Sequence, residues 1–240
     1  MSTLTEFWNM IWPGLGEGLL VTLKLSGGAL VIGLFVGLPV ALIRVYGPKS
    51  LRALATVYVD IIRGTPLLVQ LFFIYYGLAD PNVNAYFISL GLPNGLLVLE
   101  PMTAAYVALG LNSGAYQAEY FRGALQSIGS GQMLAARALG MTRIQAIVNI
   151  ILPQAFRVAI APWSNEVAYM VKYTSIVSLI AVSDLFGQAR RIMSRHYNQM
   201  TMLPLVGLIY LAIVMLMTWL MHHVERRVRI PGIEIEGGRT

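Results

Sequence analysis

Long runs without a charged side chain constrain the fold of this chain more than any other feature. Leu25–Ile43 and Gln199–Met221 hold 19 and 23 residues without Asp, Glu, Lys or Arg. A helix of about 20 apolar residues crosses the hydrocarbon core of a bilayer. Only 12% of the residues are charged and 57% are hydrophobic, whereas a soluble domain carries about 25% charged residues. The chain is therefore predicted to be an all-α integral membrane protein, with a single transmembrane domain over residues 1–240.

Three further apolar segments bring the expected number of transmembrane helices to about five. They cover approximately residues 53–79, 96–121 and 156–182. Gly64-Thr65-Pro66 is expected to bend the first of them in mid-course, because proline removes a backbone hydrogen bond. Two intervening stretches, Asp80–Gly95 and Asp184–Met200, are expected to be loops, and a basic tail is expected from His222.

Positive charges flank these spans unevenly, which predicts an orientation. The cytoplasmic side of a membrane protein carries the excess of Lys and Arg. The first side has nine such residues: Arg44, Lys49, Arg52, Arg122, Arg137, Arg143, Arg226, Arg227 and Arg229. The second side has four: Lys24, Arg190, Arg191 and Arg195. The first side is predicted to be cytoplasmic, with the N-terminus outside and the C-terminus inside. This bias explains the net charge of +6 better than nucleic-acid binding, which needs a basic soluble surface.

The stretch Gly131–Pro153, between the third and fourth spans, is not membrane-like at its start. Alanines and a leucine favour a helix, and Gly140 can adopt the left-handed conformation that ends one. Thr142 fits an N-cap, and Gln145 can close a capping box with it. The pattern predicts two short helices joined by a sharp bend at Gly140. From these residues alone, an ordinary amphipathic loop helix is equally consistent.

Four blocks of sequence resemble the permeases of bacterial ATP-binding-cassette importers. The loop is similar to their signature of Glu-Ala-Ala, three residues, Gly, and an Ile-x-Leu-Pro end, although Leu134 replaces the glutamate. The octet Arg63–Gln70 (RGTPLLVQ) and the block Ala115–Gly123 (AYQAEYFRG) resemble the polar amino acid permeases in particular. Lys172-Tyr173-Thr174-Ser175 is similar to the family's Lys-Asp-Thr-Ser, with Tyr173 departing. The matching loop positions are Ala135, Ala136, Gly140, Ile150, Leu152 and Pro153.

The resemblance implies a type I importer permease fold with a cytoplasmic coupling loop over about residues 125–145. It implies a multi-pass protein of the bacterial plasma (inner) membrane that imports polar or cationic amino acids by alternating access. The implied partners are an ATPase dimer that carries ATP-Mg, a second permease chain (identical or related), an extracytoplasmic substrate-binding protein and membrane lipid. The residues expected to couple to the ATPase are Ala135, Ala136, Arg137, Leu139, Gly140 and Thr142.

The sequence lacks the motifs of a catalyst. Gly47-Pro48-Lys49-Ser50 has neither the ending nor the spacing of a phosphate-binding loop, and there is no cysteine. No serine has an evident base partner, and His222-His223 point apart on a helix. We therefore expect no enzyme activity and no cofactor or metal bound by this chain. The alternative is a secondary amino-acid transporter or channel subunit that works without an ATPase.

Polar and ionisable residues inside the spans are the remaining signal, because they are costly in lipid. Asp60 with Arg63, and Glu119 with Arg122, are spaced to pair on one helix face. A substrate pathway is one role for the remaining polar residues. Helix–helix hydrogen bonding, or hydration of Glu100 at the outer interface, is the alternative. The pathway candidates are Gln70, Glu100, Asn112, Ser113 and Glu166.

Overall fold

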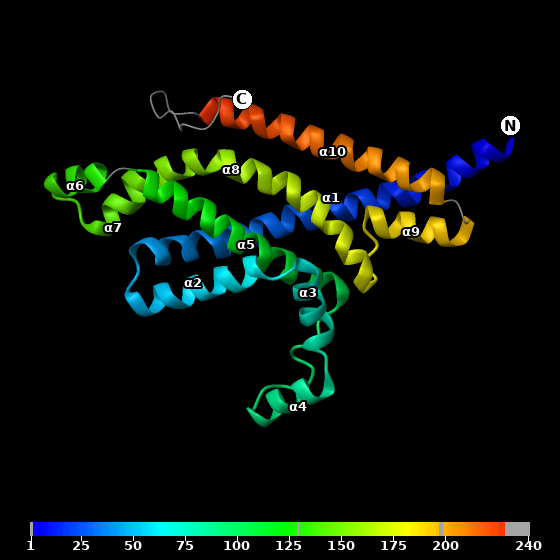
Figure 1. Ribbon diagram of the computed structural model, residues 1–240, viewed down its shortest axis with the longest axis horizontal. Helices are drawn as coiled ribbons and strands as arrows, with labels where there is room; N and C mark the ends of the chain where they lie inside the picture. The colour runs from blue at the N-terminus through cyan, green and yellow to red at the C-terminus, as the bar shows by residue number, and fades with distance from the viewer. Residues whose placement is uncertain (1, 129, 197–198, 229–240) are drawn as a thin grey trace.

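The computed structural model describes residues 2–128, 130–196 and 199–228, and within these ranges it contains helices and no strand (Figure 1). The all-α prediction is confirmed. The helices are α1 (Ser2–Tyr46), α2 (Lys49–Gly64), α3 (Leu67–Phe72), η1 (Phe73–Gly77), α4 (Pro81–Ser89), α5 (Pro101–Ser127), α6 (Ser130–Ala138), α7 (Arg143–Ala146), η2 (Ile147–Ile151), α8 (Leu152–Tyr173), η3 (Thr174–Ile180), α9 (Leu185–His196) and α10 (Gln199–Val228).

Three helical segments of the described chain are long and apolar enough to cross a membrane: Ile11–Tyr46, Arg143–Ile180 and Gln199–Val228. A fourth crossing is possible if α2 and Leu67–Gly77 form one span, although they meet at an angle of 107°. The bend predicted at Gly64-Thr65-Pro66 is therefore confirmed and is a complete break. Helix α5 has 27 residues, which is about 40 Å of helix, but its composition is less apolar. The expected number of five spans stays a prediction.

Both segments that were expected to be loops contain a helix, so those two predictions were wrong. Helix α4 begins where Asp80 accepts hydrogen bonds from the backbone amides of Asn82 and Val83, and Pro81 occupies its first turn. A capping aspartate followed by proline is a strong start signal for a helix. Helix α5 begins only at Pro101, so Glu100 is its N-cap residue rather than part of its first turn.

Helix α9 was missed because its composition is polar, yet it has one apolar face. Leu185, Ala189 and Met193 recur every four residues and are buried against α1 and α10. The expected basic tail also begins later than predicted, because α10 continues through Val228. The remaining tail lies outside the described residues.

Helices α1 and α5 pack closely because both carry glycines four residues apart. These are Gly33 and Gly37 on α1, and Gly110 and Gly114 on α5. A Cβ atom added at Gly37 would lie 2.7 Å from the backbone oxygen of Gly114. Such pairs of small residues let helix backbones approach in membranes, where the hydrophobic effect does not drive helices together.

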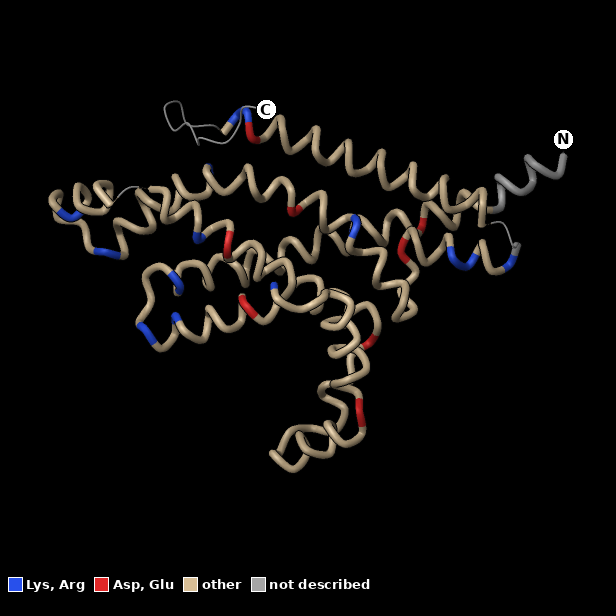
Figure 2. Tube along the Cα trace, in the orientation of Figure 1, with Lys and Arg blue, Asp and Glu red and all other residues tan. Residues whose placement is uncertain are grey.

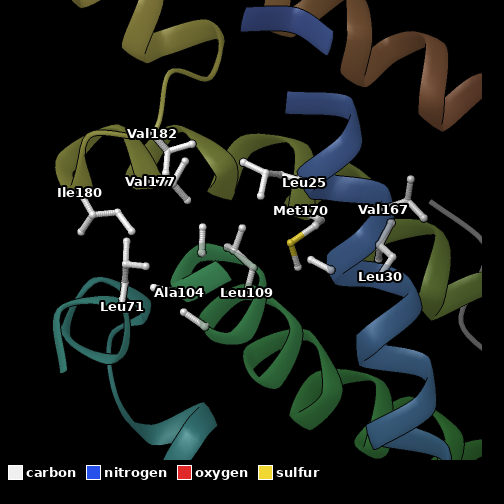
Figure 3. Packing of buried hydrophobic residues seen from close by; sticks show 13 residues of the cluster. Leu25, Leu30, Leu71, Ala104, Leu109, Val167, Met170, Val177, Ile180 and Val182 are labelled. Atoms are coloured by element: carbon white, nitrogen blue, oxygen red, sulfur yellow. The ribbon is translucent and has the colours of Figure 1, made fainter. Parts of the chain in front are cut away.

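A hydrophobic core fixes the helices around this pair. It combines side chains from α1, α3, α5, α8 and η3 (Figure 3). Leu25, Leu71, Leu109, Met170 and Ile180 are among its most deeply buried members. The core therefore holds α3, which follows the break after α2, and the end of α8 against the α1–α5 pair.

The two ends of the long axis are different. Helices α6 and α7 lie at one end, beyond the turn between α1 and α2, whereas α9 and the N-terminus lie at the other end (Figure 1). Lysines and arginines lie at both ends, and the segments between them carry scattered charged residues of both signs (Figure 2).

Candidate functional site

The loop between α5 and α8 forms a knob built by local hydrogen bonds. Gly140 has φ of 85°, and the amide of Met141 donates to the carbonyl of Ala136 at 3.1 Å. The amide of Gly140 donates to the carbonyl of Arg137 at 3.0 Å. This is the Schellman pattern, in which a left-handed glycine ends a helix and satisfies its last carbonyls. The bend predicted at Gly140 is confirmed.

The next helix starts with the predicted capping box. The Gln145 amide donates to Thr142 Oγ1 at 3.3 Å, and the Thr142 amide donates to Gln145 Oε1 at 2.8 Å. Helix α7 is not a separate short helix, however. It continues through η2 into α8, so Arg143–Ile180 is one helical segment. Continuous helix therefore joins the knob to the middle of the molecule.

The knob presents apolar side chains to its surroundings. Leu134, Leu139 and Ile144 are 67%, 81% and 74% exposed. Of the predicted coupling residues, Ala135, Arg137, Gly140 and Thr142 are also exposed, whereas Ala136 is buried. An exposed apolar patch of this kind marks an interaction surface. Residue 129 of the expected loop lies outside the described residues.

Gln70 satisfies backbone carbonyls at the break between α2 and α3. Its Nε2 atom donates to the carbonyl of Ile62 at 2.7 Å, the carbonyl of Thr65 at 3.0 Å and Thr65 Oγ1 at 2.9 Å. Its Oε1 atom accepts from Asn112 Nδ2 at 3.0 Å. Backbone carbonyls freed inside a membrane need such partners. These contacts give Gln70 and Asn112 a helix-joining role, and any role in a pathway stays a prediction.

A buried polar cluster joins α5 to α8 around Glu166. Ser113 donates to Glu166 Oε1 at 2.8 Å, and the Tyr120 hydroxyl donates to Glu166 Oε2 at 3.2 Å. Glu166 is only 2% exposed and Ser113 is fully buried. Two hydroxyl donors hold this carboxylate, and no ion pair of the described residues involves it. An ionisable group inside a span is a candidate functional residue, because it is costly in lipid.

Two residues that the sequence analysis did not single out extend this cluster. Gln117 Nε2 donates to the carbonyl of Leu30 and to Ser113 Oγ, both at 3.0 Å. Trp163 Nε1 donates to Gln117 Oε1, also at 3.0 Å. The available signal was spacing, because Ser113 and Gln117 lie one helical turn apart on α5.

Glu100 is separate from this cluster. It is exposed at the start of α5, and 12 residues of chain separate it from Asn112, which is about 18 Å of helix. The structure therefore brings together Gln70 with Asn112, and Ser113 with Glu166, but not Glu100 with either pair.

Every ion pair of the described chain involves Glu119. Arg44 Nη1 lies 2.5 Å from Glu119 Oε2, Arg63 Nη1 lies 3.8 Å from the same atom, and Arg122 contacts Glu119 Oε1. The predicted Glu119–Arg122 pair is confirmed. The predicted Asp60–Arg63 pair is wrong, because Arg63 faces α5, where it also lies over the Tyr116 ring at 5.2 Å. One carboxylate thus ties α1, α2 and α5 together.

Metal chemistry has no candidate site in the described ranges. No three His, Cys, Asp or Glu side chains gather there as a metal ion would need. The arrangement offers instead an exposed knob, a break in one span and a buried carboxylate.

Comparison with protein families gives a match over most of the chain. Residues 29–230 match the family described as the inner membrane component of binding-protein-dependent transport systems. The L-cystine transport system permease protein TcyB of Bacillus subtilis is 36% identical over 226 residues, which cover 92% of this chain and 91% of that protein. The glutamine transport system permease protein GlnP of Escherichia coli is 34% identical, with 93% and 98% covered.

Solved structures give the same result for the fold. An amino acid ABC transporter crystallised with histidines superposes with a TM-score of 0.78 at 36% identity, covering 92% of this chain and 98% of that one. The methionine transporter MetNI in inward-facing conformations superposes with a TM-score of 0.74 at 20% identity, covering 92% and 98%. The latter likeness shows the fold alone.

Proposed function

The chain belongs to the family of inner membrane components of binding-protein-dependent transport systems, and from this premise we propose how it works as the permease of an amino acid ATP-binding-cassette importer. Membership of this family favours an ATP-driven importer over a secondary transporter or channel. We propose that the chain itself is not an enzyme and binds no cofactor, and that ATP-Mg is bound and hydrolysed by a separate ATPase subunit.

The observation that carries the proposal is the knob between α5 and α8. Two ATPase subunits that close on ATP would push on the exposed side chains Leu134, Leu139 and Ile144. The Schellman turn and the capping box make the knob rigid, and α7 continues into α8, so the push reaches the helix that carries Glu166. Because Leu134 replaces the acid of the family signature, we propose that the ATPase groove facing it is apolar.

The complete importer has further parts. We propose a second permease chain, identical or related, that completes the pathway, and a substrate-binding protein that delivers the amino acid from outside. The assembly lies in the lipid of the bacterial plasma (inner) membrane. The end with the knob, which has the larger number of lysines and arginines, faces the cytoplasm, so the N-terminus is outside and the C-terminus is inside.

We propose polar or cationic amino acids as the substrates. Glu166 supports this class because its buried carboxylate is held by Ser113 and Tyr120 hydroxyls and has no basic partner among the described residues. An ammonium or guanidinium group can take the place of one hydroxyl when the pathway opens. Exposed Glu100 would act earlier, by attracting the same positive group at the outer entrance.

Replacement of Gly140 by valine tests the coupling role. A Cβ atom at Gly140 would touch nothing within 4 Å, so the effect comes from φ of 85° alone, which a β-branched residue resists. Transport and substrate-stimulated ATPase activity should fall together, with normal membrane insertion. Asparagine tolerates this conformation, so Gly140→Asn should retain much of the activity.

The matched control is Gly131→Val on α6. A Cβ atom there also touches nothing within 4 Å, and the glycine has no positive φ. Normal uptake by Gly140→Val, or an equal loss in both valine variants, would refute the coupling role of the turn.

A further inference from the structure

A pocket with three arginines lies at the end of the molecule opposite the knob. Its volume is about 340 Å³, and we call it the arginine pocket. Its lining comes from the end of η3, the turn that follows and the polar face of α9. Helices α9 and η3 both contact α1, and α9 lies near the N-terminal end of α1 (Figure 1). The lining residues of the pocket are Ser178, Ala181, Val182, Ser183, Gly187, Arg190, Arg191, Ser194 and Arg195.

The chain builds this pocket with a fixed backbone. Ala181 has φ of 64°, so the chain turns sharply between η3 and α9. The Gly187 amide donates to Asp184 Oδ1 at 2.8 Å, and a Cβ atom at Gly187 would lie 2.7 Å from the carbonyl oxygen of Val182. The apolar face of α9 is packed inside the chain, which leaves its arginines on the outward face. The pocket is therefore a property of the fold and not of mobile side chains alone.

The positive charge of the pocket is not neutralised within the described chain. Every ion pair of the described residues involves Glu119 on α5, and none involves an arginine of α9. Arg190 makes one long hydrogen bond, of 3.4 Å, to the carbonyl of Ser178. The nearby carboxylate of Asp184 is fully buried and is occupied by Gly187 and by the Tyr210 hydroxyl, at 3.0 Å. Arginine matches the planar geometry of carboxylates, and serine hydroxyls add further donors.

We propose that the arginine pocket is a docking site for a carboxylate side chain on the surface of the extracytoplasmic substrate-binding protein. This rests on the proposed function and on the proposed orientation. Three arginines on the outer side run against the bias of positive charge to the inside, and an acidic protein partner gives them a role. Six of the nine lining residues are serine or arginine, so the pocket suits a charged group better than an acyl chain.

The test uses the complete importer in nanodiscs of phosphatidylcholine, with ATPase activity measured against the concentration of its substrate-binding protein. Arg190→Gln/Arg191→Gln removes two adjacent charges from the pocket. Arg226→Gln/Arg227→Gln removes two adjacent exposed charges at the end of α10 and is the matched control.

The concentration of binding protein that gives half-maximal activity should rise about tenfold in the pocket variant, with a weaker salt dependence, because exposed charge pairs act mainly on encounter. The maximal rate and the control variant should stay unchanged. Equal curves for wild type and pocket variant would overturn the docking site.

Two other outcomes are distinct from these. Nanodiscs that also contain phosphatidylglycerol would reveal a lipid site if the pocket variant lost a response to that lipid while its curve for the binding protein did not move, and this would overturn the proposal. A wild-type complex that no binding protein stimulates would overturn the proposed function itself.

Discussion

Replacing Gly37 by alanine tests the close packing of α1 on α5. The added Cβ atom would lie 2.7 Å from the Gly114 carbonyl oxygen and 2.9 Å from the Ala118 backbone nitrogen. Both are backbone atoms, so no side-chain rotation relieves the contact. Ordinary van der Waals contact begins near 3.4 Å, so the two helices must separate by about 0.7 Å and lose dispersion contacts along their length.

Overpacking of this kind costs about 1–3 kcal/mol, whereas alanine gains about 1 kcal/mol over glycine in a helix. Gly27→Ala is the matched control, because Gly27 is exposed on the same helix and its Cβ atom would touch nothing within 4 Å. The gain in helix propensity is common to both variants, so the difference in their stability measures the cost of the contact between α1 and α5.

The measurement is the apparent melting temperature of the two purified variants in one detergent. Gly37→Ala should melt roughly 2–12 °C below Gly27→Ala, since 1 kcal/mol shifts the midpoint of a chain of this size by about 2–4 °C. Equal melting temperatures would mean that α1 and α5 accept the extra atom, and the argument from backbone contact would be refuted.

Three further outcomes are expected. Glu166→Gln and Glu100→Gln remove charge at constant size, so uptake of arginine should fall several-fold more than uptake of glutamine; an equal fall for both amino acids would indicate a packing role. A reporter fused after Gly232 should be cytoplasmic and one fused after Gly91 should be external, and the reverse pattern would refute the orientation. Burial raises the pKa of Asp184 above its ordinary value, so folding favours the protonated carboxyl, and the stability present at low pH is lost as the pH rises through the raised pKa. The melting temperature of the wild type should therefore fall as the pH rises from the ordinary pKa of an aspartate through the raised pKa of Asp184. The melting temperature of Asp184→Asn, which has no titrating carboxyl at this position, should depend less on pH.

The knob was predictable because its signals are local. The left-handed glycine and the capping box of Thr142 with Gln145 each act over at most six residues of chain, and their geometry does not depend on the remainder of the fold. The break at Gly64-Thr65-Pro66 is predictable for the same reason.

The polar contacts inside the molecule were less predictable, because their partners are distant in sequence. Arg44 and Glu119 are 75 residues apart, and Gln117 and the Leu30 carbonyl are 87 residues apart. Only the packing of α1 on α5 brings them together. A pairing rule based on helix spacing found Arg122 and wrongly assigned Arg63 to Asp60.

Helix α9 and the glycine pairs could have been predicted from the sequence. The apolar residues Leu185, Ala189 and Met193 follow the helical period, but the arginines between them suggested a solvated loop. Gly33 with Gly37 shows the spacing of close helix pairs in membranes. That pattern matters only when a second helix carries its counterpart, and the fold supplies it through Gly110 and Gly114.

The shared carboxylate of Glu119 makes the order of evolutionary change asymmetric. Loss of Arg44, Arg63 or Arg122 leaves the acid with two positive partners, whereas loss of Glu119 leaves three neighbouring guanidinium groups repelling one another, with Arg44 and Arg122 partly buried and Arg63 exposed. An unpaired charge is costly where it is buried, and Arg44 is the most buried of the three arginines. A lineage can therefore replace these arginines one at a time, but it can give up the glutamate only after most of them have gone.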